Sequence, residues 1–119
     1  MCSMCFRISH EFTVTEEKIR QYALLTGDDN PIHLEREEAE RQGFQAPIAH
    51  GLLTMGLVMD MTSRFTQEGM RISDYEVRFI KPVYKDEAIE ISAKVEASES
   101  QVQLKITGEK VQGLVVLEE

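Results

Sequence analysis

The chain has 119 residues, of which 42% are hydrophobic and 29% charged, and its net charge is −8 at pH 7. This size and composition are typical of one globular domain that can bury a core. An acidic chain is poorly suited to bind nucleic acid, because neutralising phosphates requires basic surface. We therefore expect a single domain over residues 1–119 and no nucleic-acid partner.

The sequence contains no segment that we expect to enter a membrane. Its most apolar run, from Gly51 to Met61, is too short for a transmembrane helix and contains Asp60. The N-terminus lacks a basic region followed by an apolar one, so we expect no signal peptide. The expected location is the cytoplasm.

The N-terminal segment begins with an isolated Cys-x-x-Cys pair, Cys2 and Cys5. A structural zinc site needs four ligands and the sequence has no second cysteine pair, so we expect residues 1–5 to form a flexible tail without a metal. From Phe6 to Phe12, apolar and polar side chains alternate loosely, which predicts a first strand.

A helix is predicted to follow this strand and to end at a glycine. Thr13-Val-Thr-Glu16 has the pattern of a capping box, in which a hydroxyl caps the helix and a carboxylate follows three residues later. Apolar residues then recur along one helical face, at Ile19, Tyr22, Ala23 and Leu25. Gly27 is the kind of residue that terminates a helix.

The next residues, Asp28-Asp-Asn-Pro31, predict a stiff turn directly before His33. Asp and Asn side chains bond nearby backbone groups, and Pro31 fixes its own φ and keeps Asn30 out of the helical region. Such a turn can be a plain helix-breaking loop. It can also hold the Asp28 carboxylate near the His33 imidazole, and such a pair can move a proton.

Two more helices are predicted in the first two thirds of the chain. The first is charged, runs from Leu34 to Gln42 and has a solvated face. The second runs from His50 to Phe65, and its apolar residues cover nearly every direction, which predicts burial on all sides. Gly51 lies at its start, where backbone N–H groups lack helical partners.

The C-terminal half alternates apolar and polar residues as strands do. The alternation predicts strands over Tyr75–Phe79, Ile89–Glu96, Val102–Thr107 and Lys110–Glu118. The last of these is apolar on both faces, so we expect both to be covered. The sum is an α+β fold in which an antiparallel sheet of about five strands wraps around the long apolar helix. Exposed sheet edges favour a dimer.

Two motifs in this order resemble those of the MaoC-like (R)-specific enoyl-CoA hydratases. They are Tyr22-x-x-Leu-Thr-Gly-Asp28-x-Asn30-Pro31-Ile-His33, with Ala39 after it, and then Ala49-His50-Gly51. The second motif is also similar to the acyl-carrier-protein dehydratases of fatty-acid synthesis. With the strand pattern, the resemblance covers nearly the whole chain. It implies a hotdog fold whose helical overhang carries the catalytic turn, and a homodimer or a higher oligomer.

The resemblance also implies an activity, the reversible hydration of trans-2-enoyl thioesters to (R)-3-hydroxyacyl thioesters. It implies no cofactor, since coenzyme A or the carrier protein's phosphopantetheine arm is part of the substrate. By position, Asp28 and His33 match the family's catalytic pair, and Gly51 matches the glycine whose N–H binds the thioester oxygen. A carboxylate and an imidazole sharing one water can do this chemistry near neutral pH, and an N–H at a helix start stabilises the enolate. We expect Asn30, Pro31 and His50 to support the site, and no metal.

One position departs from the family pattern. Many members carry a serine about two helical turns after the His-Gly pair, and this chain has Met59 there. A secondary polar contact is therefore in doubt, and we expect a more apolar acyl tunnel.

Basic residues gather between residues 64 and 85, where five basic minus three acidic residues leave +2 in a chain of −8. The stretch fits a ligand with phosphates, such as coenzyme A or a phosphopantetheine arm. It equally fits solvated charge on strands. The candidate phosphate contacts are Arg71, Arg78, Lys81 and Lys85.

Two other functions stay open from the sequence. One is a hotdog thioesterase, although the Asp-x-Asn-Pro-x-His turn belongs to the hydratases. The other is a non-catalytic acyl-thioester binder, or the structural partner in a heterodimer, in which the Asp28 and His33 pair would be unused.

Overall fold

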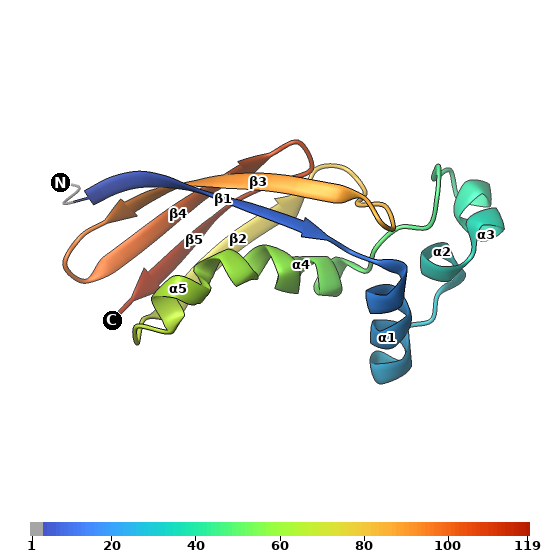
Figure 1. Cartoon of the computed structure of the whole chain (residues 1–119), viewed down its shortest axis with the longest axis horizontal. Coiled ribbons are helices and arrows are strands. Elements are labelled where there is room, and N and C mark those ends of the chain that lie inside the picture. The colour runs from blue at the N-terminus through green and yellow to red at the C-terminus, as the bar shows by residue number, and fades with distance from the viewer. Residues whose placement is uncertain (1–3) are drawn as a thin grey trace. The chain divides into compact units, whose positions relative to one another are not determined.

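The computed structural model describes residues 4–119 (Figure 1). Its elements in chain order are β1 (Met4–Thr13), α1 (Glu16–Thr26), α2 (Pro31–Leu34), α3 (Arg36–Arg41), α4 (Gly51–Met59), the 3₁₀ turn η1 (Asp60–Thr62), α5 (Ser63–Thr66), β2 (Arg71–Phe79), β3 (Ala88–Ala97), β4 (Gln101–Gly108) and β5 (Val111–Glu118). They form two compact units. We call the one with residues up to 11, 58–81 and 90–119 the sheet unit, and the one with residues 12–57 and 82–89 the helical unit.

The sheet unit holds most of a five-stranded sheet with the order β1-β3-β4-β5-β2. The β3–β4, β4–β5 and β2–β5 pairs are all antiparallel. Every second side chain of the three inner strands is buried, including Ile91, Ala93, Val95, Val102, Leu104, Ile106, Val111, Val115 and Leu117. Each fully buried Val, Leu or Ile side chain contributes about 1.5–3 kcal/mol. The four strands predicted after residue 70 are confirmed, and period-two burial is found in β3, β4 and β5, whereas β2 is exposed along nearly its whole length.

The last strand, β5, lies between β4 and β2. Both of its apolar faces were expected to be covered, but the described residues cover only one of them. Val111 and Val115 are fully buried, whereas Leu114 on the other face is 42% exposed. β2 lies at an edge, and its cross-strand pairs set Tyr75 opposite Val115 and Phe79 opposite Val111. The core-side face of the edge strand is therefore apolar.

The first strand begins two residues earlier than predicted, because Met4 and Cys5 already belong to β1. The tail expected over residues 1–5 is therefore partly strand. Cys2, the other half of the Cys-x-x-Cys pair, lies outside the described residues.

The long helix is found where the sequence predicts it, as α4, η1 and α5 in succession. The expectation that it is buried on all sides is wrong for this chain. Its buried residues follow helical spacing along one side, at Thr54, Val58, Met61, Thr62 and Phe65, while Leu52 is 78% exposed. No helix formed by residues 4–119 is long and apolar enough to cross a membrane.

The helical unit begins with α1, whose cap differs from the predicted one. The N-cap is Thr15 rather than Thr13: its side chain accepts a hydrogen bond from the Lys18 N–H at 3.2 Å. The reason is that β1 continues through Thr13, and the next residue, Val14, is buried. The charged helix predicted from Leu34 is likewise divided, since Glu35 adopts an extended conformation between α2 and α3.

Candidate active site

The turn after α1 presents Asp28 at an exposed position. Gly27 ends the helix in the left-handed region at φ 78°, and its N–H donates to the Ala23 carbonyl at 2.9 Å. Asn30 then caps α2 by accepting from the Ile32 N–H at 3.1 Å, and Pro31 takes the first helical position. Gly27 thus determines where α1 ends, and Asn30 and Pro31 determine where α2 begins, which locates Asp28 between the two helices.

His33 lies on α2, and its imidazole is fixed by the loop that precedes α4. Its Nδ1 is 2.8 Å from the Ile48 carbonyl oxygen. A carbonyl can only accept, so we assign the proton to Nδ1, which leaves Nε2 with a free lone pair in the neutral ring. The Ile48 N–H donates back to the Ile32 carbonyl at 3.1 Å, so the two segments are joined twice. His33 is therefore oriented as a base that acts through Nε2.

His50 is buried, with 1% of its surface exposed, and contacts both Asp28 and His33. Its Nε2 is 2.8 Å from the main-chain carbonyl oxygen of Asp28. Its ring stacks on that of His33, with centroids 3.9 Å apart and an interplanar angle of 26°. The Tyr22 ring lies 4.7 Å from it in a tilted arrangement. The sequence identified Tyr22 only as a residue of the helix face and of the motif, so this contact was missed.

These residues bring a carboxylate and two imidazoles to one place. One Asp28 carboxylate oxygen and one ring nitrogen from each of His33 and His50 all lie within 4.8 Å of one another. Two hydrogen bonds of about 2.8 Å that meet at a tetrahedral angle span about 4.6 Å, so one water can bridge such groups. The cluster therefore has the spacing needed to hold a water between an acid and a base.

The same three residues are also of the kinds that bind metals. However, Nδ1 of His33 and Nε2 of His50 are engaged by carbonyl groups, and stacked rings keep the remaining lone pairs in nearly parallel planes. This arrangement suits water better than a chelated ion. The expectation of a metal-free site stays a prediction.

Gly51 opens α4 beside this cluster in the chain. The first bond of the helix joins the Thr54 N–H to the His50 carbonyl at 3.0 Å, so helix geometry leaves the Gly51 N–H without a partner in the helix. A methyl group built on Gly51 would meet no atom within 4 Å. The side of Gly51 on which a side chain would stand is therefore open.

The loop before α4 is held by the segment that leads to β3. The Ala49 N–H donates to the Val83 carbonyl at 2.7 Å, and the Lys85 N–H donates to the Pro47 carbonyl at 2.9 Å. An isolated antiparallel bridge pairs Ile48 with Tyr84 between them. The carbonyl of Ile48 that receives His33 is thus fixed by main-chain bonds.

The four candidate phosphate contacts are distributed over both units. Arg71 pairs with Glu118 at 3.5 Å and Lys81 with Glu109 at 3.5 Å, both in the sheet unit. Lys85 belongs to the helical unit, where its Nζ is 3.8 Å from Glu16. Of the four, Lys85 is the one that shares a unit with the candidate site.

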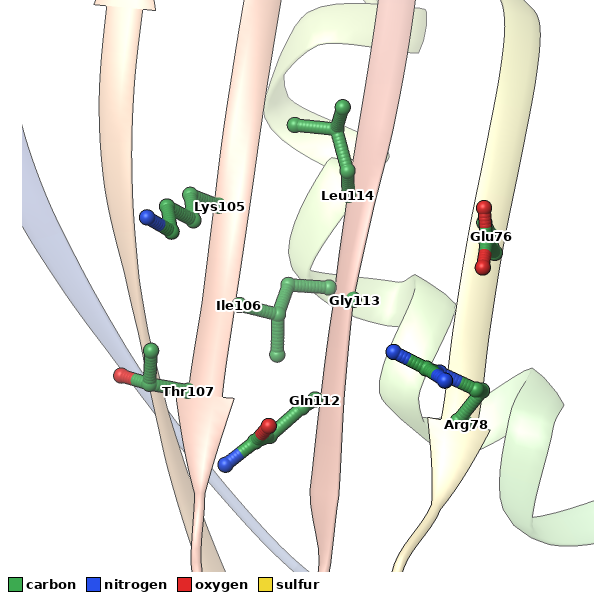
Figure 2. Close-up of a pocket in the computed structure, with 8 residues that line it drawn as sticks. All are labelled: Glu76, Arg78, Lys105, Ile106, Thr107, Gln112, Gly113 and Leu114. Atoms are coloured by element: carbon green, nitrogen blue, oxygen red, sulfur yellow. The ribbon is translucent and has the colours of Figure 1, made fainter.

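Arg78, the fourth basic residue, lines a groove of about 510 Å³ on the outer face of β2, β5 and β4 (Figure 2). Its side chain points toward β5, whereas that of Lys105 points away from it, and Glu76 adds a negative charge. The groove contains no histidine and no pair of groups suited to proton transfer. The cluster in the helical unit is therefore the better candidate for chemistry.

Solved structures show the same fold. An (R)-hydratase from A. caviae involved in PHA biosynthesis superposes with a TM-score of 0.74 at 21% identity, covering 99% of this chain and 96% of that one. A chain of the ChsH1-ChsH2 complex from Mycobacterium tuberculosis superposes with a TM-score of 0.80 at 21% identity, covering 99% of this chain and 97% of that one. The chain has the hotdog fold, as predicted. Residues 3–116 match the MaoC like domain, so the chain belongs to the MaoC-like family.

A curated relative is 3-hydroxyacyl-thioester dehydratase X from Mycobacterium tuberculosis. It is 44% identical over 71 residues, which are 59% of this chain and 24% of the relative. The chain therefore spans about a quarter of the length of that relative.

Proposed function

We propose that this protein is a lyase that adds water to trans-2-enoyl thioesters, or removes it from (R)-3-hydroxyacyl thioesters. The observation that carries the proposal is the cluster of Asp28 and His33, whose spacing fits one bridging water. Membership of the MaoC-like family supports it, because the relative it resembles is named a hydroxyacyl-thioester dehydratase.

In the hydration direction, the bridging water is held by the Asp28 carboxylate and by Nε2 of His33. Nε2 takes a proton as the water oxygen bonds to C3, and the C2–C3 double-bond electrons move onto the thioester oxygen. The Gly51 N–H donates to this developing enolate oxygen, aided by the positive end of the helix dipole. C2 then receives a proton from the same acid–base pair, so the base returns to its starting state.

The open side of the site suggests that a second chain completes it. Asp28 is exposed in the single chain, and so is Leu52 in the first turn of α4. An exposed site would let water compete for every polar contact, whereas excluding water strengthens them. We propose that the second chain is another copy of this protein.

The edge strand of the sheet unit supports self-association independently. Its core-side residues Tyr75 and Phe79 are 57% and 37% exposed, next to an unpaired edge of the kind that proteins normally cover. The similar structure from Mycobacterium tuberculosis is a complex of ChsH1 with ChsH2, so a different second chain is the competing arrangement.

The test is hydration of crotonyl-CoA, followed by loss of the enoyl absorbance and chiral analysis of the product. We expect Asp28→Asn and His33→Gln each to lower kcat/KM by about 10³-fold, within the usual range for general acid–base residues. Asp29→Asn is the matched control, since Asp29 is a neighbouring exposed carboxylate outside the cluster.

Thermal unfolding of each variant should match the wild type. Wild-type rates in either cluster variant would contradict the proposal. Release of free thiol from a saturated acyl-CoA, with no hydration, would instead identify a thioesterase.

A further inference from the structure

The proposed reaction uses Asp28, His33 and Gly51, but the most deeply buried polar side chain near them is His50. It is 1% exposed, and its Nδ1 is buried with no hydrogen-bond partner among the described residues. A buried polar atom without a partner is unfavourable and calls for an explanation.

The hydrogen bonds of His50 determine which tautomer it adopts. Nε2 is 2.8 Å from the Asp28 carbonyl oxygen, which can only accept, so Nε2 carries the proton. A second proton on Nδ1 would place an N–H in a buried position with no acceptor, and a charge would be buried with it. The contacts therefore favour the neutral ring with a bare Nδ1.

Unlike the partly exposed His33, His50 has its free ring nitrogen buried, so taking up a proton there would leave a buried charge, and His50 is poorly placed to transfer protons. Its only N–H is committed to a main-chain carbonyl, and its lone pair faces no donor in the described chain. The main chain of His50 is equally fixed, since its carbonyl accepts from both the N–H and the hydroxyl of Thr54, at 3.0 and 2.8 Å. The residue connects the start of α4 rigidly to its surroundings.

His50 contacts both residues that take part in the proposed proton transfer, Asp28 and His33. Through Nε2, His50 holds the main chain of Asp28, which is 22 residues earlier in the sequence. Through its ring face it packs on His33, with centroids 3.9 Å apart. The His50 side chain therefore constrains both the position of the Asp28 carboxylate and the plane of the His33 imidazole.

We propose that His50 is a positioning residue, an uncharged imidazole that sets the separation between the Asp28 carboxylate and the His33 ring. The inference rests on the proposed hydration function. The two contacts of His50, the hydrogen bond from Nε2 and the ring stack on His33, can be removed separately by mutation. His50→Gln retains an N–H donor near Nε2 but loses the ring, and His50→Phe retains a ring for stacking but loses the donor.

The first experiment measures the kinetics of crotonyl-CoA hydration. Misplacing a catalytic group by about 1 Å can lower a rate by about 10²-fold, so we expect His50→Ala to lower kcat by about that factor with little change in KM. Gln and Phe should each recover part of the loss. His10→Gln, a histidine on β1, is the control and should keep wild-type kcat.

The second experiment does not need activity. Ring ¹⁵N chemical shifts at neutral pH, assigned with His10→Gln and His50→Gln, should show His50 protonated at Nε2 alone. In His50→Ala the His33 ring signals should shift or broaden.

An imidazolium or an Nδ1–H tautomer for His50 would overturn the proposal, as would wild-type kcat in both His50→Gln and His50→Phe. A wild type that hydrates no enoyl thioester would instead refute the proposed function. In that case the His50 ring state and its effect on His33 still decide the structural part of the inference.

Discussion

The sheet unit and the helical unit are stabilised by different kinds of contact. In the sheet unit, Leu104 and Val115 are fully buried and pair in register, so apolar area and regular main-chain bonds hold the strands. In the helical unit, the segment around Ile48 is held by hydrogen bonds between loops, and a histidine rather than an aliphatic residue fills the buried position beside the turn. The sheet unit provides a rigid frame, and the helical unit keeps polar atoms in defined positions.

The two units should therefore respond differently to an added methyl group. A close-packed interior tolerates little added volume. A site that receives a ligand must leave open space, so the same added methyl group should do little harm to stability there. Glycines in the two units allow this contrast to be tested directly with single Gly→Ala changes.

The largest effect is expected in the sheet unit, at Gly113 on β5. A Cβ built there would lie 2.3 Å from the Glu76 carbonyl oxygen and 2.7 Å from the Val77 Cα, both main-chain atoms of the paired strand β2. Gly113→Ala should therefore displace a strand and lower the free energy of unfolding by about 3 kcal/mol, at the upper end for overpacking. Urea unfolding followed by circular dichroism measures the loss.

Gly108→Ala is the graded control for that change. Its added carbon would approach an Ile91 side-chain methyl at 2.9 Å but main-chain atoms only at 3.3 Å, so the loss should be smaller. Equal stability of the Gly113 variant and the wild type would show that β2 and β5 are not packed as closely as described.

The next effect is expected in the helical unit, at Gly51. Its added methyl group meets no atom within 4 Å, so Gly51→Ala should leave the melting temperature unchanged or slightly raised. The methyl group would stand beside the N–H proposed to receive the thioester oxygen, and we expect kcat/KM for crotonyl-CoA to fall about 10²-fold. Gly56→Ala, in the same helix and equally open, should keep wild-type kinetics.

The sheet was predictable from sequence because a strand with one face toward the core alternates apolar and polar residues. The boundaries of β3, β4 and β5 lie within two residues of those predicted. Helix boundaries were less certain, since Thr13 and Thr15 both fit a cap and only the extent of β1 decides between them. The exposure of Leu52 was not predictable, because an apolar helix does not indicate whether its own chain covers it.

The candidate site was predictable in its residues but not in its contacts. The motif indicated Asp28, His33 and Gly51 as candidate site residues. It gave no indication that His33 bonds to the Ile48 carbonyl, because that contact depends on how a loop 15 residues away is held. The stack of His33 on His50 likewise depends on where α4 begins.

The smallest effect is expected where the sheet unit meets the proposed second copy. Tyr75 is 57% exposed on the core-side face of the edge strand, so Tyr75→Ala should leave the fold intact. If a second copy covers this face, truncating the ring should weaken the dimer about tenfold, about 1.4 kcal/mol, a typical loss for an interface aromatic. Sedimentation velocity over a concentration series measures the dimer dissociation constant.

The control for the Tyr75 change is Glu76→Ala, on the opposite face of the same strand. It should leave the dimer dissociation constant within about twofold of the wild type, since exposed charges contribute little. A wild-type chain that stays monomeric at every concentration would contradict the proposed self-association and favour a different second chain.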